Sequence, residues 1–478
     1  MKLSLSRPRL SLLSLALCAP SLWAAPWVDT QDNYLRQSLQ TLAQAGVISG
    51  PVNTYPLMWK NIAADLARAD EQPTAELRFA LAHVRSALHA NQHDYIAGVK
   101  LKASSDPSLF QSFGESYFEQ ASAAVFKEYL GDNWAAKTQL NYRKLDDNRQ
   151  EQSLTFDGSY LAVIAGNWVL ALDQQAQWWG PGQQTSLLLS NNARPIPSLR
   201  LSRHSWQGSD NVLFSWLGPW SFTSFIGQGE HSSLPRQIKH FGARFSARPL
   251  PQLELGLSRI SQWGGDSIGN RLENSHDNGL SAFTDMLLLN DDNNADNMAA
   301  LDLTFHTRLG DWPLSFYTEL ADDNGTNKLS KPLQLYGLRS FFGSDSAVHT
   351  LSLEWSDTYI RCDDQPQAGN CAYQGDIYPQ GYRRYGRVIG SGYGADAKVL
   401  SAGYRYQTFD GYSWAASVLR GQFINLNDTV RNWQLRLEYR QPLLNGLLSV
   451  EGRVFDKSPQ PELNIKRGSL AVTWEYRF

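Results

Sequence analysis

The alternation of apolar and polar residues along most of the chain limits its fold more than any other feature. The last nine residues show it best: Leu470, Val472, Trp474, Tyr476 and Phe478 alternate with Ala471, Thr473, Glu475 and Arg477. A period of two places every large apolar side chain on one face of a strand. An apolar face with aromatic residues near its end and a terminal Phe is typical of the closing strand of a transmembrane barrel.

This alternation begins at Ile96 and is interrupted by two kinds of connection. Short turns with Gly, Pro, Asn or Asp occur at 131–133, 166–167, 218–219, 249–251, 310–311, 343–345, 410–411 and 445–446. Long polar connections begin near 104, 146, 175, 228, 261, 321, 358, 423 and 457. Short turns that alternate with long loops in this way predict an antiparallel barrel of about 18 strands over residues 96–478, with sixteen as the alternative count.

Residues 26–95 follow a helical period instead. Apolar residues recur three or four positions apart in three segments, namely Leu35, Leu39 and Leu42; Trp59, Ile62 and Leu66; and Leu77, Leu81, Val84 and Leu88. Outer-membrane barrels keep their short turns in the periplasm, and an even strand count places both ends of the barrel on that side. We therefore predict an all-β transmembrane fold, an antiparallel outer-membrane β-barrel with a small N-terminal periplasmic α-helical bundle.

The first 25 residues have the pattern of a cleaved signal peptide. Lys2, Arg7 and Arg9 precede an apolar stretch at 10–17, and Ala24-Ala25 follows. Export together with a barrel predicts the outer membrane of a Gram-negative bacterium. Loss of the three cations would change the formal charge from -3 to about -6, an acidity that argues against nucleic acid as a partner. No stretch reaches the roughly 18 to 20 apolar residues of a helical span.

Cys362 and Cys371 lie nine residues apart in a polar segment that contains Pro and Gly. In an exported chain, such a pair is expected to form a disulfide that stiffens its loop. A metal site is the alternative, but His ligands at the usual spacing are missing from this segment. We predict neither a metal nor a cofactor.

The segment Trp178-Trp179-Gly180-Pro181-Gly182 is the most distinctive motif in the chain, and Leu187-Leu188-Leu189 follows it. Adjacent Trp residues cannot share one face of a strand, and Gly-Pro-Gly ends a strand, so a tight, shaped loop is expected. The two indoles could form a platform for a sugar. Alternatively, the loop folds into the barrel, and the Trp pair and the three Leu residues form an internal plug.

Several of these segments, taken together, resemble those of a known family. The helical start with Gly46-Val47-Ile48 and Pro56, the Trp-Trp-Gly-Pro-Gly motif, the segment 190–195 and the barrel that ends in Phe together resemble the Wzi family of capsule-assembly outer-membrane proteins. The resemblance implies an eighteen-stranded barrel with a periplasmic helical bundle. It also implies a lectin that helps to tether exported capsular polysaccharide to the cell surface, and not a catalyst.

The loop from 358 to 396 has side chains suited to an acidic polysaccharide. Tyr rings can pack on the apolar face of a sugar, and Arg can hold the carboxylate of a uronic acid. The candidate carbohydrate-binding residues are Trp178, Trp179, Tyr382, Arg383, Arg384, Tyr385 and Arg387. Alternatively, the Arg residues only pair with Asp363, Asp364, Asp376 or Asp396.

The late strands carry charges of both signs on the face that points into the barrel. These are Arg405, Arg436, Glu438, Arg440, Glu451, Arg453, Glu475 and Arg477. Mixed signs at cross-strand spacing are expected to neutralise one another and to block the interior. A track for an acidic polymer would instead be mainly basic.

One segment matches an enzyme motif. Gly265-Asp266-Ser267-Ile268-Gly269 fits the Gly-x-Ser-x-Gly pattern of a nucleophile elbow, and His276 follows as a conceivable base. The elbow needs a strand before it and a helix after it, whereas this segment lies in a long polar loop without an apolar helical stripe. We therefore predict that the chain is not an enzyme.

Taken together, these features predict an outer-membrane lectin that anchors or organises exported capsular or extracellular polysaccharide. Its expected partners are that polysaccharide, outer-membrane lipid and, through the helical unit, the periplasmic export machinery. The alternative functions are a pore for polysaccharide or small solutes, and a hydrolase with Ser267 as its nucleophile. The sequence does not identify the polymer.

Overall fold

A computed structural model describes most of the chain after its first 25 residues. The described residues are 26–69, 74–144, 153–208, 211, 214–229, 237–265, 295–323, 332–344, 346–360, 372–374, 378, 381–424, 429–458 and 466–478. None of the helices in these ranges is long and apolar enough to cross a membrane.

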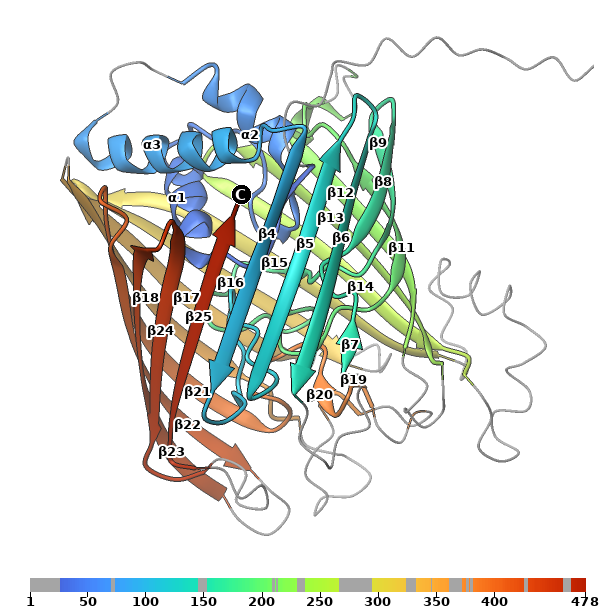
Figure 1. Ribbon diagram of the computed structural model, residues 1–478, viewed down its shortest axis with the longest axis vertical. Coiled ribbons are helices and arrows are strands. Elements are labelled where there is room, and N and C mark those ends of the chain that lie inside the picture. Colours follow the sequence, from blue (N-terminus) through green and yellow to red (C-terminus); the bar gives the residue numbers. More distant parts are fainter. Residues whose placement is uncertain are drawn as a thin grey trace, which may run out of the picture.

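A closed antiparallel barrel of 18 strands forms the wall of the molecule (Figure 1). In chain order its strands are β4 (Tyr95–Ser104), β5 (Ala121–Leu130), β6 (Trp134–Lys144), β8 (Tyr160–Ala165), β9 (Trp168–Asp173), β11 (Ser198–Arg203), β12 (Trp220–Gln228), β13 (Lys239–Leu250), β14 (Leu253–Trp263), β15 (Ala295–Leu309), β16 (Trp312–Asp323), β17 (Leu333–Gly343), β18 (Ala347–Asp357), β21 (Ala397–Thr408), β22 (Ser413–Ile424), β23 (Thr429–Leu443), β24 (Gly446–Phe455) and β25 (Gly468–Arg477). The short strand β7 (Leu154–Thr155) pairs with β6 next to β8. β25 pairs with β4 and closes the barrel, which confirms the predicted fold and the count of 18.

One predicted short turn is wrong. The connection between β11 and β12 is not limited to Gly218-Pro219 but spans 204–219 and contains a short 3-10 helix, η1 (Ser215–Leu217). Its length has a physical reason, because Trp206 reaches the helical unit, where its ring is 4% exposed and its backbone N–H donates to Asn61 Oδ1 at 3.1 Å. The other predicted turns directly join consecutive strands.

The outer face of the barrel is apolar, as the alternation predicts. Leu172 is 60% exposed and Leu470 is 56% exposed, whereas their neighbours Asp173 and Ala471 point inward and are buried. Exposed aromatic residues gather near the short turns, among them Tyr95, Tyr129, Trp134, Trp168, Trp312 and Tyr439. An apolar band with an aromatic girdle is the surface that a bilayer requires.

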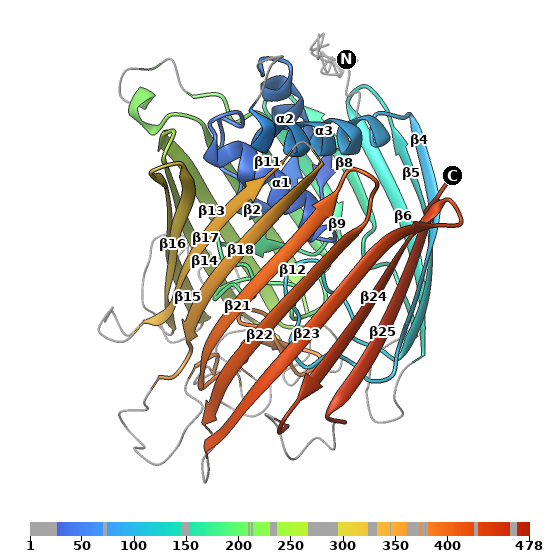
Figure 2. The ribbon, with the colours of Figure 1, turned by 90° about the vertical axis from the view of Figure 1, so that its left-hand side faces the viewer.

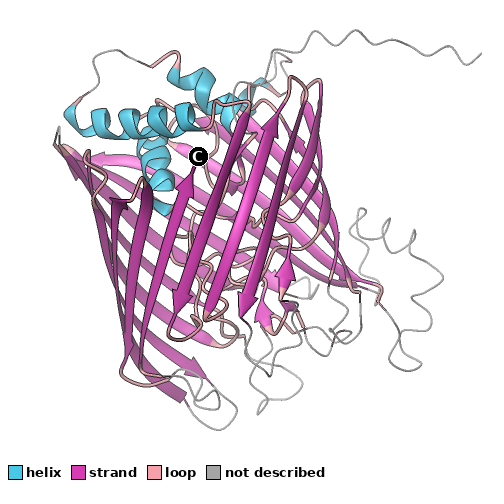
Figure 3. Cartoon of the chain, viewed as in Figure 1, coloured by secondary structure: helices cyan, strands magenta, loops and turns pink. Residues whose placement is uncertain are grey.

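Three helices occupy the mouth where the short turns lie, which we call the turn-side mouth. They are α1 (Asn33–Gln44), α2 (Trp59–Leu66) and α3 (Ala75–Ala90). α1 descends into the barrel while α2 and α3 lie across the opening (Figures 2 and 3). The side chain of Asp32 caps α1 by accepting hydrogen bonds from the backbone N–H groups of Tyr34 and Leu35 at 3.0 and 3.3 Å. The helical leucines pack against one another, as predicted, and against residues of the barrel interior.

Short strands inside the barrel join the helical unit to the segment that carries the Trp pair. β1 (Trp27–Val28) pairs with β3 (Leu57–Met58), and β10 (Trp178–Trp179) pairs with β2 (Thr54–Tyr55). A further hairpin consists of β19 (Arg383–Arg384) and β20 (Arg387–Val388). We call residues 175–197 together with 381–396 the inner plug. Its apolar residues pack against side chains of β12 and β14–β17 inside the barrel.

Candidate functional site: a closed lumen with polar pockets

Buried glutamates on the barrel wall hold the interior by its backbone N–H groups. Glu254 on β14 accepts from Val52 N at 3.0 Å and from Asn53 N at 2.9 Å. Glu254 is only 1% exposed. A carboxylate without such donors would be costly to bury, so each bond stabilises both the wall and the helical unit.

The inner plug is held in the same way. Glu319 on β16 accepts from Leu187 N at 3.0 Å and from Leu188 N at 3.2 Å. Glu354 on β18 accepts from Gln183 N at 2.6 Å and from Gln184 N at 3.2 Å. These two carboxylates satisfy the donors of an irregular segment that has no ladder of its own.

Arginines on the barrel wall bind backbone carbonyl groups of the interior. Arg248 on β13 donates to the carbonyl of Ile48 at 2.6 Å and also contacts the carbonyl of Ala43. Arg339 on β17 donates to the carbonyl of Gln40 at 3.1 Å. Both arginines therefore bind carbonyl groups at and beyond the end of α1, where the last carbonyls of a helix lack partners and carry negative partial charge.

Both indoles of the Trp pair lie inside the molecule. Trp178 is 0% exposed and packs edge-on against Phe113 with ring centroids 5.4 Å apart, while Trp179 is 1% exposed and packs against Phe225. A sugar platform requires an accessible ring face, and neither ring offers one in this conformation. With Leu187 and Leu188 both 0% exposed, the arrangement is that of the plug alternative.

The predicted cluster from Tyr382 to Arg387 lies in the hairpin β19–β20 and is only partly accessible. Tyr382 and Arg384 are buried, whereas Arg383, Tyr385 and Arg387 are half-buried. Arg387 donates to the carbonyl of Leu109 at 3.2 Å and also contacts the carbonyl of Ser108. The hairpin thus brings the predicted residues together, but some of their hydrogen-bond donors already bond to groups within the protein. Whether they contact polysaccharide stays a prediction.

Several predicted features lie outside the described residues. These are the proposed disulfide Cys362–Cys371, the nucleophile Ser267 with His276, and the aspartates Asp363, Asp364 and Asp376. The structure therefore tests neither the disulfide nor the hydrolase alternative.

The late strands form the predicted network of mutually neutralising charges. Arg436 lies 2.8 Å from Glu115 and 2.8 Å from Glu451, and Arg453 lies 2.5 Å from each of the same two glutamates. Further pairs involve Glu438, Arg440, Glu475 and Arg477. Arg405 is the exception, because it is buried and no carboxylate within the described part of the chain pairs with it.

Glu115, in the connection between β4 and β5, shows the strength of this network. Burial by itself would raise the pKa of the Glu115 carboxyl, but the guanidinium groups of Arg436 and Arg453 lower it to about 2. Burial likewise opposes ionisation of Asp32, and Arg440, at 3.0 Å, lowers the pKa of Asp32 to about 2. Both carboxylates remain charged at any physiological pH.

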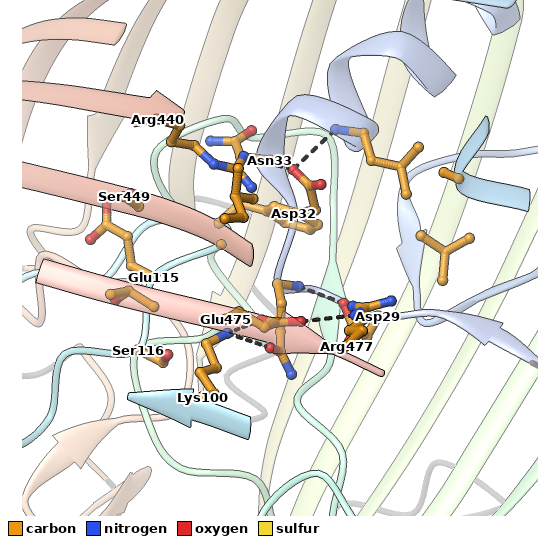
Figure 4. Close-up of a pocket in the computed structure, with 18 of the residues that line it drawn as sticks. Asp29, Asp32, Asn33, Lys100, Glu115, Ser116, Arg440, Ser449, Glu475 and Arg477 are labelled. Atoms are coloured by element: carbon orange, nitrogen blue, oxygen red, sulfur yellow. Dashed lines mark hydrogen bonds and ion pairs between the residues drawn. The ribbon is translucent and has the colours of Figure 1, made fainter. Parts of the chain in front are cut away.

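Two polar pockets lie between this network and the interior elements. Pocket 1 has a volume of about 430 Å³ and is lined by α1, α3, β4 and β23–β25 (Figure 4). Lys100, Glu475 and Arg477 point toward one another there, with Lys100 Nζ 3.1 Å from Glu475. The exposed residues Ala90 and Asn445 lie at its rim, so pocket 1 opens at the turn-side mouth.

Pocket 2 has a volume of about 110 Å³ and lies deeper, between β4–β6 and the inner plug. None of the site residues predicted from the sequence lines this pocket, whose lining includes Lys102, Gln139, Asn141, Arg143 and Asn191. The alternation along β4 already indicated that Lys100 and Lys102 share the inward face. That signal would have found the lysines, but not Asn191, which the inner plug brings to the same pocket.

Comparison with known proteins assigns the chain to a family. The family model described as capsule assembly protein Wzi matches residues 90–454. The chain belongs to the Wzi family. Family membership and the lipid-facing barrel place this Wzi-family chain in the outer membrane, which confirms the predicted location.

The chain is also similar to individual proteins. The chain is 28% identical over 336 residues to an uncharacterized 55.8 kDa protein in the cps region of Klebsiella pneumoniae, covering 68% of this chain and spanning 64% of that protein. Its structure is similar to that of Wzi from Escherichia coli, with a TM-score of 0.81 and 24% identity over 95% of this chain and 100% of that one. Wzi is described as an outer-membrane protein involved in group 1 capsule assembly and as a carbohydrate-binding β-barrel. OccK5 of Pseudomonas aeruginosa gives a TM-score of 0.45 at 10% identity, over 80% of this chain and 98% of that one.

Proposed function

We propose that this Wzi-family barrel binds exported capsular or extracellular polysaccharide and holds it at the cell surface. The observation that carries the proposal is the anchored interior: buried glutamates and arginines fix the helices and the inner plug to the wall, an arrangement that suits a binding protein better than a passage. The carbohydrate binding described for Escherichia coli Wzi, which has the same fold, supports the same function.

In this proposal the turn-side mouth faces the periplasm and the long loops face outward. Outer-membrane barrels keep short turns inside and long loops outside, and the helical unit lies at the mouth with the short turns. The helical unit is then positioned to meet periplasmic export machinery, and the exposed leucines of the wall contact lipid.

The loop-side binding residues are the accessible members of the predicted cluster, namely Arg383, Tyr385 and Arg387. Tyr385 has a positive φ of 48°, a backbone conformation that is uncommon for a bulky residue and is found more often at binding sites. Each protein contributes a weak site, and many copies hold a long polymer because their contacts do not release together.

The experiment is binding of the purified, detergent-folded barrel to the producing organism's own extracellular polysaccharide. We expect Arg383→Ala/Tyr385→Ala to bind more weakly than wild type, whereas Lys127→Ala/Tyr129→Ala, a cation–aromatic pair on the outer face of β5, binds as wild type. Heat-modifiable gel mobility checks that every variant is folded. No binding by the wild-type barrel would reject the proposal.

The pore alternative is separated by a second measurement. A barrel whose lumen is closed by anchored segments should give no steady single-channel conductance in planar bilayers. Stable conductance steps from the wild-type protein would favour the pore over the lectin.

A further inference from the structure

The two polar pockets adjoin one another along the inner face of β4. Both are lined by Gln31, Lys100, Lys102, Gly114, Glu115 and Ser116. Pocket 1 alone, at about 430 Å³, falls within the range of roughly 300–1,000 Å³ that is usual for small-molecule sites. The joined pockets therefore form a polar cavity that runs from the turn-side mouth into the middle of the barrel.

Lys102, where the pockets meet, differs from the neighbouring cations. Lys100 lies 3.1 Å from Glu475, and Arg194 lies 2.7 Å from Glu119. Lys102 Nζ instead donates to the carbonyl and the hydroxyl of Ser116, and no carboxylate in the described ranges lies within ion-pair distance of it. The register explains the difference, because β25 places Glu475 opposite Lys100 but Thr473 opposite Lys102.

Two amide side chains in the cavity have a buried oxygen to which no described group donates a hydrogen bond. Asn191, in pocket 2, is 5% exposed, and Asn33, in pocket 1, is 7% exposed. Within the described structure the Oδ1 atom of each accepts no hydrogen bond. Buried acceptors of this kind are ordinarily satisfied, so both are suited to the hydroxyl groups of a ligand.

We propose that the joined cavity is a binding site for a short stretch of acidic glycan, with a sugar carboxylate on Lys102 and sugar hydroxyls on Asn33 and Asn191. This rests on the proposed function and adds the site and the class of sugar. A carboxylate supplies the countercharge that Lys102 lacks, and a polyhydroxylated ring supplies donors for both amides. Entry is from the turn-side mouth, where pocket 1 opens.

The test measures binding of trigalacturonate, maltotriose and acetate to the full-length, detergent-folded protein by titration calorimetry. The variants are Lys102→Gln, Lys102→Arg and Lys137→Gln; Lys137, on β6, lines neither pocket. Loss of a charge-assisted hydrogen bond should weaken trigalacturonate binding about tenfold or more in Lys102→Gln. Lys102→Arg should recover part of the affinity, and Lys137→Gln should match wild type.

A second measurement keeps the proposal testable if Lys102→Gln folds poorly. Ser116→Cys places a thiol beside Lys102 in otherwise unchanged protein, and trigalacturonate should slow its modification by a methanethiosulfonate reagent. Maltotriose should have no such effect.

The outcomes separate this inference from the proposed function. Equal trigalacturonate affinity in wild type and Lys102→Gln, equal binding of maltotriose, or binding of acetate with the same dependence on Lys102 would each overturn the glycan site. If the wild-type barrel retains its own polysaccharide but binds no trigalacturonate, the site is rejected and the proposed function stands. If it binds neither, both fail.

Discussion

Two parts of the barrel wall contact the interior in different ways. On strands β13–β18, glutamates accept from backbone N–H groups of the helical unit and the inner plug, and arginines donate to backbone carbonyl groups at the end of α1; these residues are Glu254, Glu319, Glu354, Arg248 and Arg339. Strands β23–β25 and β4–β6 line the two pockets, and their contacts with the helical unit include the ion pair between Arg440 and Asp32. We call them the anchoring wall and the pocket wall.

This difference suggests that closure and ligand binding are separate tasks in one barrel. The anchoring wall joins side chains to backbone atoms, so its bonds fix the path of the interior segments whatever their side chains are. The pocket wall joins side chains mainly to other side chains, as Arg436 and Glu451 do at 2.8 Å. Its charges can therefore be neutralised while a cavity remains. Variants of either wall should affect one task and spare the other.

The largest effect is expected when the anchoring wall releases the inner plug. Glu319→Ala/Glu354→Ala leaves the N–H groups of Gln183, Leu187 and Leu188 without their acceptors, at about 1–3 kcal/mol for each unsatisfied group. We expect conductance steps in planar bilayers that wild type does not show.

The matched control for this variant is Glu438→Ala on the pocket wall, which should stay silent in bilayers. A silent double variant with normal heat-modifiable mobility would show that the carboxylates do not hold the plug.

Loss of the central arginine of the pocket wall should rank second. Arg436→Met leaves Glu115 and Glu451 buried with less compensation, which should lower the free energy of unfolding by about 3–5 kcal/mol. Urea unfolding in lipid vesicles, followed by Trp fluorescence, measures it. Arg431→Met, at an exposed position of the same strand, should change stability by less than about 0.5 kcal/mol. Increased conductance of Arg436→Met would contradict the separation of the two walls.

Acidification should weaken the contact between α2 and the β11–β12 connection through His204, the first residue of that connection. Burial, and the nearby ammonium of Lys60, lower the pKa of His204 from 6.5 to about 4. The unfolded state therefore binds more protons between these values, so the contribution of His204 to stability is complete above pH 6.5 and is lost as the pH falls toward 4.

Hydrogen exchange of residues 59–66 should accordingly become faster between pH 6.5 and 4, after correction for intrinsic exchange. The effect should shrink in His204→Asn. The ion pairs of Asp32 and Glu115 with the pocket wall should not respond over this range, because both carboxyls have pKa values of about 2. An equal response from the β23–β25 residues that line pocket 1 would break the comparison.

The smallest effect concerns Asp32, which links α1 to the pocket wall. Asp32→Ala removes the N-cap of α1 and should cost about 1 kcal/mol of unfolding free energy. Asp32→Asn keeps the cap and loses only the ion pair with Arg440, so it should cost less than Asp32→Ala, which loses both. Urea unfolding of both variants measures the difference, and an equal loss of stability in the two would show that the cap contributes nothing beyond the ion pair.

The sequence was sufficient to predict those parts of the fold that depend on residues close together in the chain. Turns such as Gly310-Asp311 and the alternation from Trp312 onward are local signals, and the strands begin and end close to them. The connection at 204–219 was misjudged because its length depends on the contact of Trp206 with the distant helical unit.

The interior could not be predicted in the same way. Whether Trp178 is exposed depends on Tyr55 and Phe113, which are far away in sequence, so both alternatives were open until the elements were placed. The cavity at Lys102 was missed because its charge imbalance arises from the register of β25 against β4, and a single strand carries no information on register.

The closed seam between β25 and β4 also constrains how the protein can be assembled. Asp32 and Arg440 are 408 positions apart and Val52 and Glu254 are 202 apart, yet both pairs lie within the finished barrel. Contacts between such distant positions form slowly. α1 therefore enters the barrel either before β25 joins β4 or afterwards through the turn-side mouth. A mutation that delays the docking of α1 would leave an open seam in the first case and a closed wall without its interior contacts in the second.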